Sequence, residues 1–171
     1  MASGATYTPI ATQTLGSAAP SVTFSSIPST YTDLILVGNI YSTAALGVAD
    51  LVITFNGDTT SGLYSFTQID GDGTTATSHR RTARNGINVS YNAGPAPLAN
   101  GGFLSISQIQ NYSNTTTYKT LLSRANAASE GVDAFIGLWR NTAAIVSVNI
   151  ASTSGNIDAA STLTLYGIAA A

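Results

Sequence analysis

The chain has 171 residues, a formal net charge of −2 and no cysteine. This length suits one domain that buries roughly 70% of its unfolded surface, and the lack of cysteine excludes disulfides, thiolate catalysis and cysteine-based zinc sites. The acidic pI of about 4.9 argues against nucleic-acid binding as the main role. The sequence shows neither a secretory leader nor an apolar run of about 18 residues, so we expect cytosolic synthesis and no membrane partner.

The first half of the chain predicts short strands separated by turns. Residues 1–20 are expected to form an N-terminal arm in which residues 7–15 make an edge strand, because Pro9 lacks an amide donor. Further strands are predicted at residues 21–27, 33–41, 50–56 and 64–69, and both faces of residues 33–41 are expected to be covered. Gly, Asn and Asp predict turns at residues 56–58 and 70–75.

The second half begins with residues 76–102, which fit no single pattern. This stretch holds a basic segment at residues 79–84, a short strand pattern at 87–91 and a Gly/Pro/Ala loop at 93–102. Strands are then predicted at residues 103–112, 118–127 and 135–140, with a helical turn competing at 121–130.

The end of the chain, residues 142–168, predicts two strands around a polar turn at residues 152–161. Val146, Val148 and Ile150 would share one face of the first strand. Leu163 and Leu165 would share one face of the second, which would close the fold.

These elements predict an all-β domain over residues 21–171. About nine to eleven short strands with Gly/Asn/Asp turns and no amphipathic helix are typical of an antiparallel sandwich or barrel. A jelly-roll-like antiparallel β-sandwich with about eight core strands plus additions fits this count best.

Charged residues are scarce: they make up 8% of the chain, against about 25% in an average soluble domain. A free monomer usually depends on surface charge for its solubility. Such a neutral surface is typical of a chain covered by other subunits, or of one that meets uncharged partners such as glycans. A free monomer that is unusually rich in serine and threonine is the remaining alternative.

The basic segment is the candidate contact site. It brings the only histidine, His79, together with Arg80, Arg81 and Arg84. Guanidinium groups form paired hydrogen bonds with carboxylates, so these residues would make a docking patch for a partner subunit. A solvated loop is the competing interpretation.

Three aspartates lie in or beside the glycine-rich turns: Asp58, Asp70 and Asp72. The spacing of Asp70 and Asp72 matches only the opening of a calcium loop, and no glutamate follows where a bidentate ligand is needed. Turn formation explains the aspartates better. We therefore expect no metal and no cofactor.

Catalytic patterns are weak as well. A Ser-His-Asp triad would have to use His79, and no Gly-x-Ser-x-Gly turn is present to hold a nucleophile. Residues 71–76 resemble a dinucleotide loop only loosely, without a βαβ unit around them. A glycosidase carboxylate pair stays open because such pairs are assembled in space. The expectation is that the protein is not an enzyme.

Aromatic residues are a better candidate for recognition, since tyrosine combines stacking area with a hydroxyl group and suits sugars or subunit interfaces. Trp139, next to apolar Leu138, is expected in the core. The tyrosines are Tyr7, Tyr31, Tyr41, Tyr64, Tyr91, Tyr112, Tyr118 and Tyr166.

Several segments resemble a module that is common in virion proteins of tailed bacteriophages. They are residues 24–36 (FSSIPSTYTDLIL), 53–58 (ITFNGD) with Tyr64 and Ser65 after them, and the ending 161–168 (STLTLYGI). Tyr112, residues 118–120, residues 137–139 and Ala144-Ile145 fit the same pattern in the same order. The resemblance covers residues 20–168, and its motifs are signatures of a fold that bring no active site with them.

In that family the module resembles a jelly-roll β-sandwich, commonly trimeric, and occurs in tail-fibre heads and in proteins that decorate capsids. The resemblance therefore implies a virion structural protein. Tail fibres usually carry an N-terminal anchor, whereas the first strand is predicted from Tyr7. We accordingly expect a homotrimeric capsid cement protein that binds the major capsid protein at the capsid surface, through the arginine patch or the N-terminal strand. The alternative is a tail-fibre head that recognises a host surface glycan.

Overall fold

The computed structural model describes residues 6–44, 49–93, 102–127 and 131–169. Within these ranges the regular backbone consists of twelve strands. They are β1 (Tyr7–Thr14), β2 (Ser21–Phe24), β3 (Asp33–Ile40), β4 (Ala49–Phe55), β5 (Tyr64–Gly71), β6 (Ala76–Arg84), β7 (Ile87–Ala93), β8 (Phe103–Gln110), β9 (Lys119–Ala127), β10 (Gly131–Trp139), β11 (Val148–Ser152) and β12 (Thr162–Ile168). The same ranges contain no helix that is long and apolar enough to cross a membrane.

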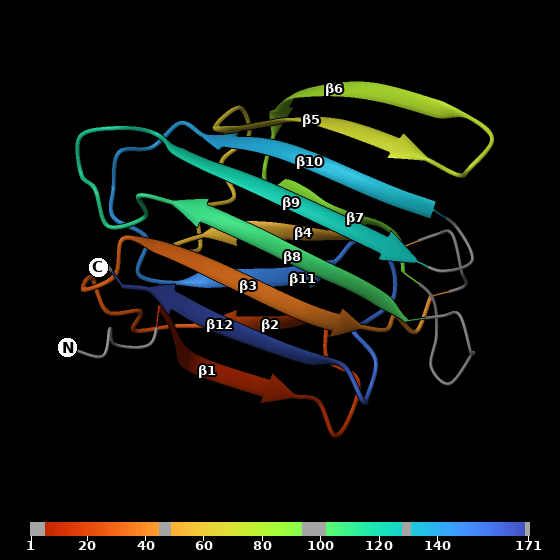
Figure 1. The fold of residues 1–171 in the computed structure, drawn as a ribbon, viewed down its shortest axis with the longest axis horizontal. Coiled ribbons are helices and arrows are strands. Elements are labelled where there is room, and N and C mark those ends of the chain that lie inside the picture. The colour runs from red at the N-terminus through yellow and green to blue at the C-terminus, as the bar shows by residue number, and fades with distance from the viewer. Residues whose placement is uncertain (1–5, 45–48, 94–101, 128–130, 170–171) are drawn as a thin grey trace.

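The strands form two antiparallel sheets that pack face to face (Figure 1). The large sheet has eight strands in the order β1-β12-β3-β8-β9-β10-β5-β6, and the small sheet has four in the order β2-β11-β4-β7. Consecutive strands repeatedly pass from one sheet to the other. The predicted all-β, jelly-roll-like antiparallel sandwich is confirmed, and β1 lies at an edge of the large sheet as Pro9 led us to expect.

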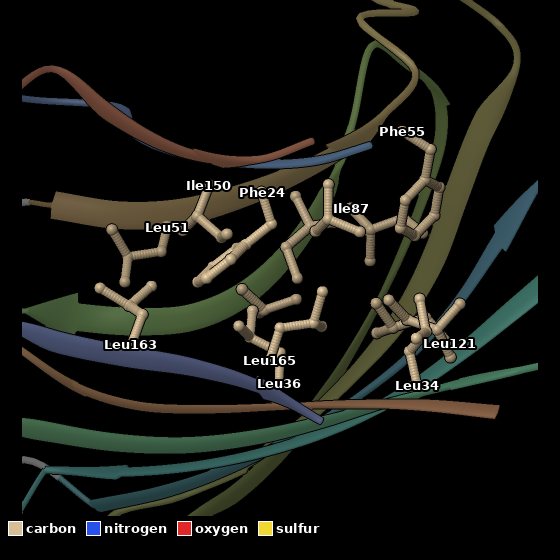
Figure 2. Close-up of a cluster of buried hydrophobic side chains, with 14 of the residues drawn as sticks. Phe24, Leu34, Leu36, Leu51, Phe55, Ile87, Leu121, Ile150, Leu163 and Leu165 are labelled. Carbon is tan, nitrogen blue, oxygen red and sulfur yellow. The ribbon is translucent and has the colours of Figure 1, made fainter. Parts of the chain in front are cut away.

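The core lies between the two sheets and follows from period-2 alternation in the strands. Phe24, Leu51 and Ile150 point from the small sheet toward the side chains of the large sheet (Figure 2). Leu163 and Leu165 of β12 are fully buried, as their spacing predicted. Apolar burial of this kind contributes about 25 cal/mol for each Å² removed from water.

An aromatic cluster closes one end of the core. Trp139 stacks on Tyr64, with ring centroids 6.1 Å apart, and lies 5.4 Å from the ring of Phe55. The indole Nε1 donates a hydrogen bond to Asp58 Oδ2 (3.0 Å), and the Tyr64 hydroxyl donates to the Asp58 carbonyl oxygen (2.9 Å). The expectation that Trp139 belongs to the core is confirmed.

The turn after β4 holds this end in place. Asn56 and Gly57 have φ angles of 55° and 68°, which the predicted turn chemistry allows. The Asn56 side chain donates to the Ala144 carbonyl (2.8 Å) and accepts from the Val146 amide (2.8 Å). The turn at residues 56–58 thus ties β4 to the segment before β11.

The two closing strands are not paired with each other. β11 lies between β2 and β4 in the small sheet, whereas β12 lies between β1 and β3 in the large sheet. The connecting residues cross from one sheet to the other and are anchored by Ile157, which is fully buried. Two strands that each have one apolar face can bury these faces as neighbours in one sheet or as members of two sheets that face each other. Alternation of apolar and polar residues is the same in both cases and therefore does not predict which arrangement forms.

Two local expectations are wrong. Val146 is 53% exposed, because β11 begins only at Val148. Val37 on the outer side of β3 is 37% exposed, so only part of that face is covered. The strand predicted at residues 118–127 is confirmed: residues 121–127 belong to β9, whose alternate residues fill the core, and do not form the competing helical turn. Residues 128–130 of that alternative lie outside the described residues.

Candidate functional site

The outward face of the large sheet exposes a set of large apolar side chains. In its central strands, alternate residues such as Phe103 and Leu121 fill the core, which turns their sequence neighbours toward solvent. These neighbours are 37–62% exposed although they are Val, Leu or Ile. We call them, with the half-buried Ile106, the outward band: Val37, Ile69, Leu104, Ile106, Leu122, Val132 and Ile136.

The register of the strands gathers the outward band on neighbouring strands of the sheet. Directly opposed residues on one face of an antiparallel pair lie about 4.5–5.5 Å apart at their Cβ atoms. One row across the sheet runs Val37, Ile106, Arg124, Ala134, Ile69, and the next runs Gln108, Leu122, Ile136, Thr67. Exposed apolar patches of more than a few hundred Å² are rare on monomers and mark interaction sites.

Charge is scarce on this face between Asp33 of β3 and Arg80 of β6. By strand alternation, Arg124 is the one charged residue that β5, β8, β9 and β10 direct outward. Its side chain borders a shallow hollow of about 420 Å³ that Leu104, Asn126 and Val132 also line. A second subunit could approach the band without meeting strong repulsion.

The basic segment is a strand, β6, at the other edge of the large sheet. All nine of its residues are exposed, so the segment is solvated, but it is a strand and not a loop. The register with β5 places His79 and Arg81 on one face and Arg80 on the other, opposite Thr67. Neither face of β6 is buried, and the sequence therefore lacks the apolar alternation that identified the other strands.

Two carboxylates face each other where β5 and β10 meet. Asp70 is directly opposite Asp133 in the register, and His79 Nε2 lies 3.8 Å from Asp70 Oδ1. Burial raises the pKa of Asp133 to about 6, and the charges of Asp70 and Asp50 contribute to this rise. Within the described ranges no three His, Cys, Asp or Glu side chains come together as metal ligands.

Replacing Asp133 with asparagine should stabilise the fold at neutral pH. The Asp133 carboxyl has a folded pKa near 6 and an unfolded pKa of about 3.9, so its ionisation opposes folding above pH 6. This penalty shrinks as the pH falls from 6 to 4, where the folded carboxyl is already protonated. Because the group is partly exposed, we expect a gain of about 1 kcal/mol at pH 7.

Urea unfolding of both forms at pH 7 and pH 4 measures this difference. The gain should be largely gone at pH 4. Equal stability at pH 7, or the same gain at both pH values, would show that the Asp133 carboxylate is not the cause.

The other two turn aspartates hold their loops. Asp72 Oδ1 accepts hydrogen bonds from the amides of Thr74 (2.8 Å) and Thr75 (2.6 Å), and the bonds from Thr75 and Thr74 lower the pKa of Asp72. Asp58 Oδ1 accepts from the Thr60 amide (3.0 Å). The interpretation of these residues as turn formers is confirmed.

Lys119 is buried and forms hydrogen bonds within the protein. It is 1% exposed, and its ammonium group donates to the carbonyl oxygens of Thr117 (2.7 Å) and Thr142 (3.1 Å).

The candidate recognition tyrosines lie partly in the core and partly at the surface. Tyr64 and Tyr112 are buried in the core, whereas Tyr7 and Tyr118 are more than half exposed. The side chain of Tyr91 and most of the loop predicted at residues 93–102 lie outside the described residues.

Sequence reasoning missed the outward band, although a signal was present. Pairs of consecutive apolar residues, such as Leu121-Leu122 and Phe135-Ile136, put one apolar side chain on each face of a strand. The same signal led us to expect two covered faces for residues 33–41 alone. In the central strands of the large sheet, such pairs of apolar residues indicate that the outward face, which is exposed in the single chain, is apolar as well.

No protein-family model and no curated protein sequence matches the chain. Solved structures show only distant similarity. Galectin LEC-6 of Caenorhabditis elegans is 5% identical, with 90% of this chain and 94% of that chain covered and a TM-score of 0.34. The CBM40 of the Ruminococcus gnavus IT-sialidase, bound to α2,3 sialyllactose, is 11% identical, with 96% and 95% covered and a TM-score of 0.32.

A tail fibre protein of an E. coli phage, gp63.1, is also similar. It is 11% identical, the match covers 85% of this chain and 22% of that chain, and the TM-score is 0.25. At such scores the similarity identifies neither a ligand nor a reaction.

Proposed function

We propose that this protein is a structural subunit of a tailed-bacteriophage virion, a homotrimeric cement protein on the capsid surface that clamps neighbouring capsomers. The observation that carries the proposal is the outward band. A face with many exposed large apolar side chains and few charges is costly in a free monomer and is typical of a subunit buried in an assembly. The resemblance of residues 20–168 to virion modules supports the phage setting.

The size of the face supports contact with further copies of this chain. The outward band lies on the five neighbouring strands β3, β8, β9, β10 and β5. At about 4.8 Å apart and about 27 Å long, these strands present roughly 650 Å². A stable interface buries about 600–1,000 Å² on each partner. In a closed trimer the contacts are heterologous, so the band of one copy contacts a different surface of the next copy.

Cementing follows from mass action. A subunit that binds the assembled shell, and does not bind loose capsid subunits, lowers the free energy of the shell. The occupied shell then resists heat and osmotic stress better than the bare shell. No catalytic group is needed for this role.

Comparison of virions assembled with and without this protein tests the function. We expect the protein in hundreds of copies per particle, and particles without it should lose their contents at a lower temperature. Unchanged heat and osmotic resistance of the depleted particles would overturn the cementing role.

A tail-fibre head that binds a host glycan is the second candidate, and the hollow beside Arg124 favours it. The hollow combines apolar Leu104 and Val132 with polar Arg124 and Asn126, which is the composition expected of a small-ligand site. A glycan array probed with the purified protein separates the two functions. Specific glycan binding that Arg124→Ala abolishes would favour the tail location.

A further inference from the structure

The β6 strand has a free hydrogen-bonding edge. It pairs with β5 and with no other described strand, and all nine of its residues are exposed. The Asp72 amide donates to the Thr75 carbonyl (3.2 Å) at the start of this hairpin, and bonded and non-bonded pairs alternate from there. Ser78 and Arg80 accordingly direct their main-chain N–H and C=O groups away from β5.

The two edge strands of the large sheet differ in how readily they can pair with an additional strand. β1 contains Pro9 and an irregular register between Pro9 and Ala11, both of which block pairing. β6 contains no proline, and its only break in register lies at the far end, between Tyr64 and Phe66 of β5. Residues 76–81 therefore offer a regular edge about six residues long.

The positive charge of β6 favours an acidic partner strand. Three of the six Lys and Arg residues of the chain lie on β6, leaving three against eight acids elsewhere, a net charge of −5. A second β6 would be repelled by the facing arginines, so the edge disfavours pairing between copies. A strand that carries Asp or Glu would place carboxylates beside Arg80 on one face and Arg81 on the other.

We propose that β6 binds an extended acidic polypeptide segment of the shell protein by strand addition. The segment extends the large sheet by one strand: its main chain pairs with Ser78 and Arg80, and its carboxylates pair with the arginines. This inference deepens the proposed function and rests on it, since it names the chemistry by which the subunit would dock on the shell.

A random library of 12-residue displayed peptides is the probe. Selection on the purified protein should enrich proline-free peptides rich in Asp and Glu. The strongest peptide, made synthetically, should bind at least tenfold more weakly to the double variant Arg80→Glu/Arg81→Glu. It should also slow amide hydrogen exchange of Ser78 and Arg80 and leave the amide of His79, which faces β5, unchanged.

A matched pair of variants tests the main-chain contact. Ser78→Pro removes one outward N–H group without removing a bond to β5, and should weaken peptide binding at least tenfold. Ser78→Val keeps that N–H group and should bind as the unaltered protein does. Peptides that are not acidic, or that bind equally to Ser78→Pro and Ser78→Val, would overturn strand addition.

Oligomeric mass separates failure of this inference from failure of the function. Circular dichroism and sedimentation should show that the β6 variants keep their fold and mass. A trimer without acidic-peptide binding would contradict the strand-addition inference alone. A monomer that still binds such peptides through β6 would contradict the trimer and leave strand addition standing.

Discussion

Replacing Leu122 with arginine should convert the oligomer into monomers. Leu122 is 51% exposed at the centre of the outward band, directly opposite Ile136 and two residues from Arg124 on the same face. A second cation there would be buried without a partner in the interface. We expect self-association to weaken at least a hundredfold, which corresponds to about 3 kcal/mol.

Sedimentation equilibrium over a range of protein concentrations measures this effect, and Val146→Arg is the matched control. Val146 is also an exposed apolar residue, 53% accessible, but it lies outside the large sheet. Its replacement should leave the mass unchanged. An unchanged mass for Leu122→Arg would show that the outward band is not the contact surface.

Replacing Trp139 with alanine should cost about 3–5 kcal/mol of unfolding free energy, the usual cost of removing a fully buried Trp. Trp139 is fully buried between Tyr64 and Phe55, and its indole N–H is bonded to Asp58. Trp139→Phe keeps most of the packing and loses the hydrogen bond, so its cost should be smaller, about 1–2 kcal/mol.

Urea unfolding followed by circular dichroism measures these costs at one fixed protein concentration, because association contributes to stability. Tryptophan fluorescence cannot follow the variants, since Trp139 is the only tryptophan. If Trp139→Ala were as stable as the unaltered protein, the aromatic cluster would not support this end of the core. If both variants cost the same, the Asp58 bond would be the main contribution.

The sequence predicted those parts of the fold in which one face of a strand is apolar and the other polar. Leu163 and Leu165 on β12 are one example, and the turn at Asn56 and Gly57 shows that local turn chemistry is equally informative. Pairing partners were harder to predict. β11 and β12 follow each other in the chain but lie in different sheets. The pattern of apolar residues predicts which face of a strand is buried, but it does not predict which strands pair with it.

The candidate site was predictable only in part. His79, Arg80, Arg81 and Arg84 stood out as a cationic cluster, yet their strand was missed because β6 buries neither face. The outward band was missed because a strand that is apolar on both faces gives no clear period. Ile136, for example, directly follows Phe135; both residues are apolar, but Phe135 is buried and Ile136 is exposed to solvent.

The mass of the purified protein in solution tests the central claim most directly, that copies of this chain cover the outward band. Sedimentation equilibrium at micromolar concentration should give a trimer of about 52 kDa, three times the chain mass of 17.4 kDa. A mass of 17.4 kDa at every concentration would contradict the account.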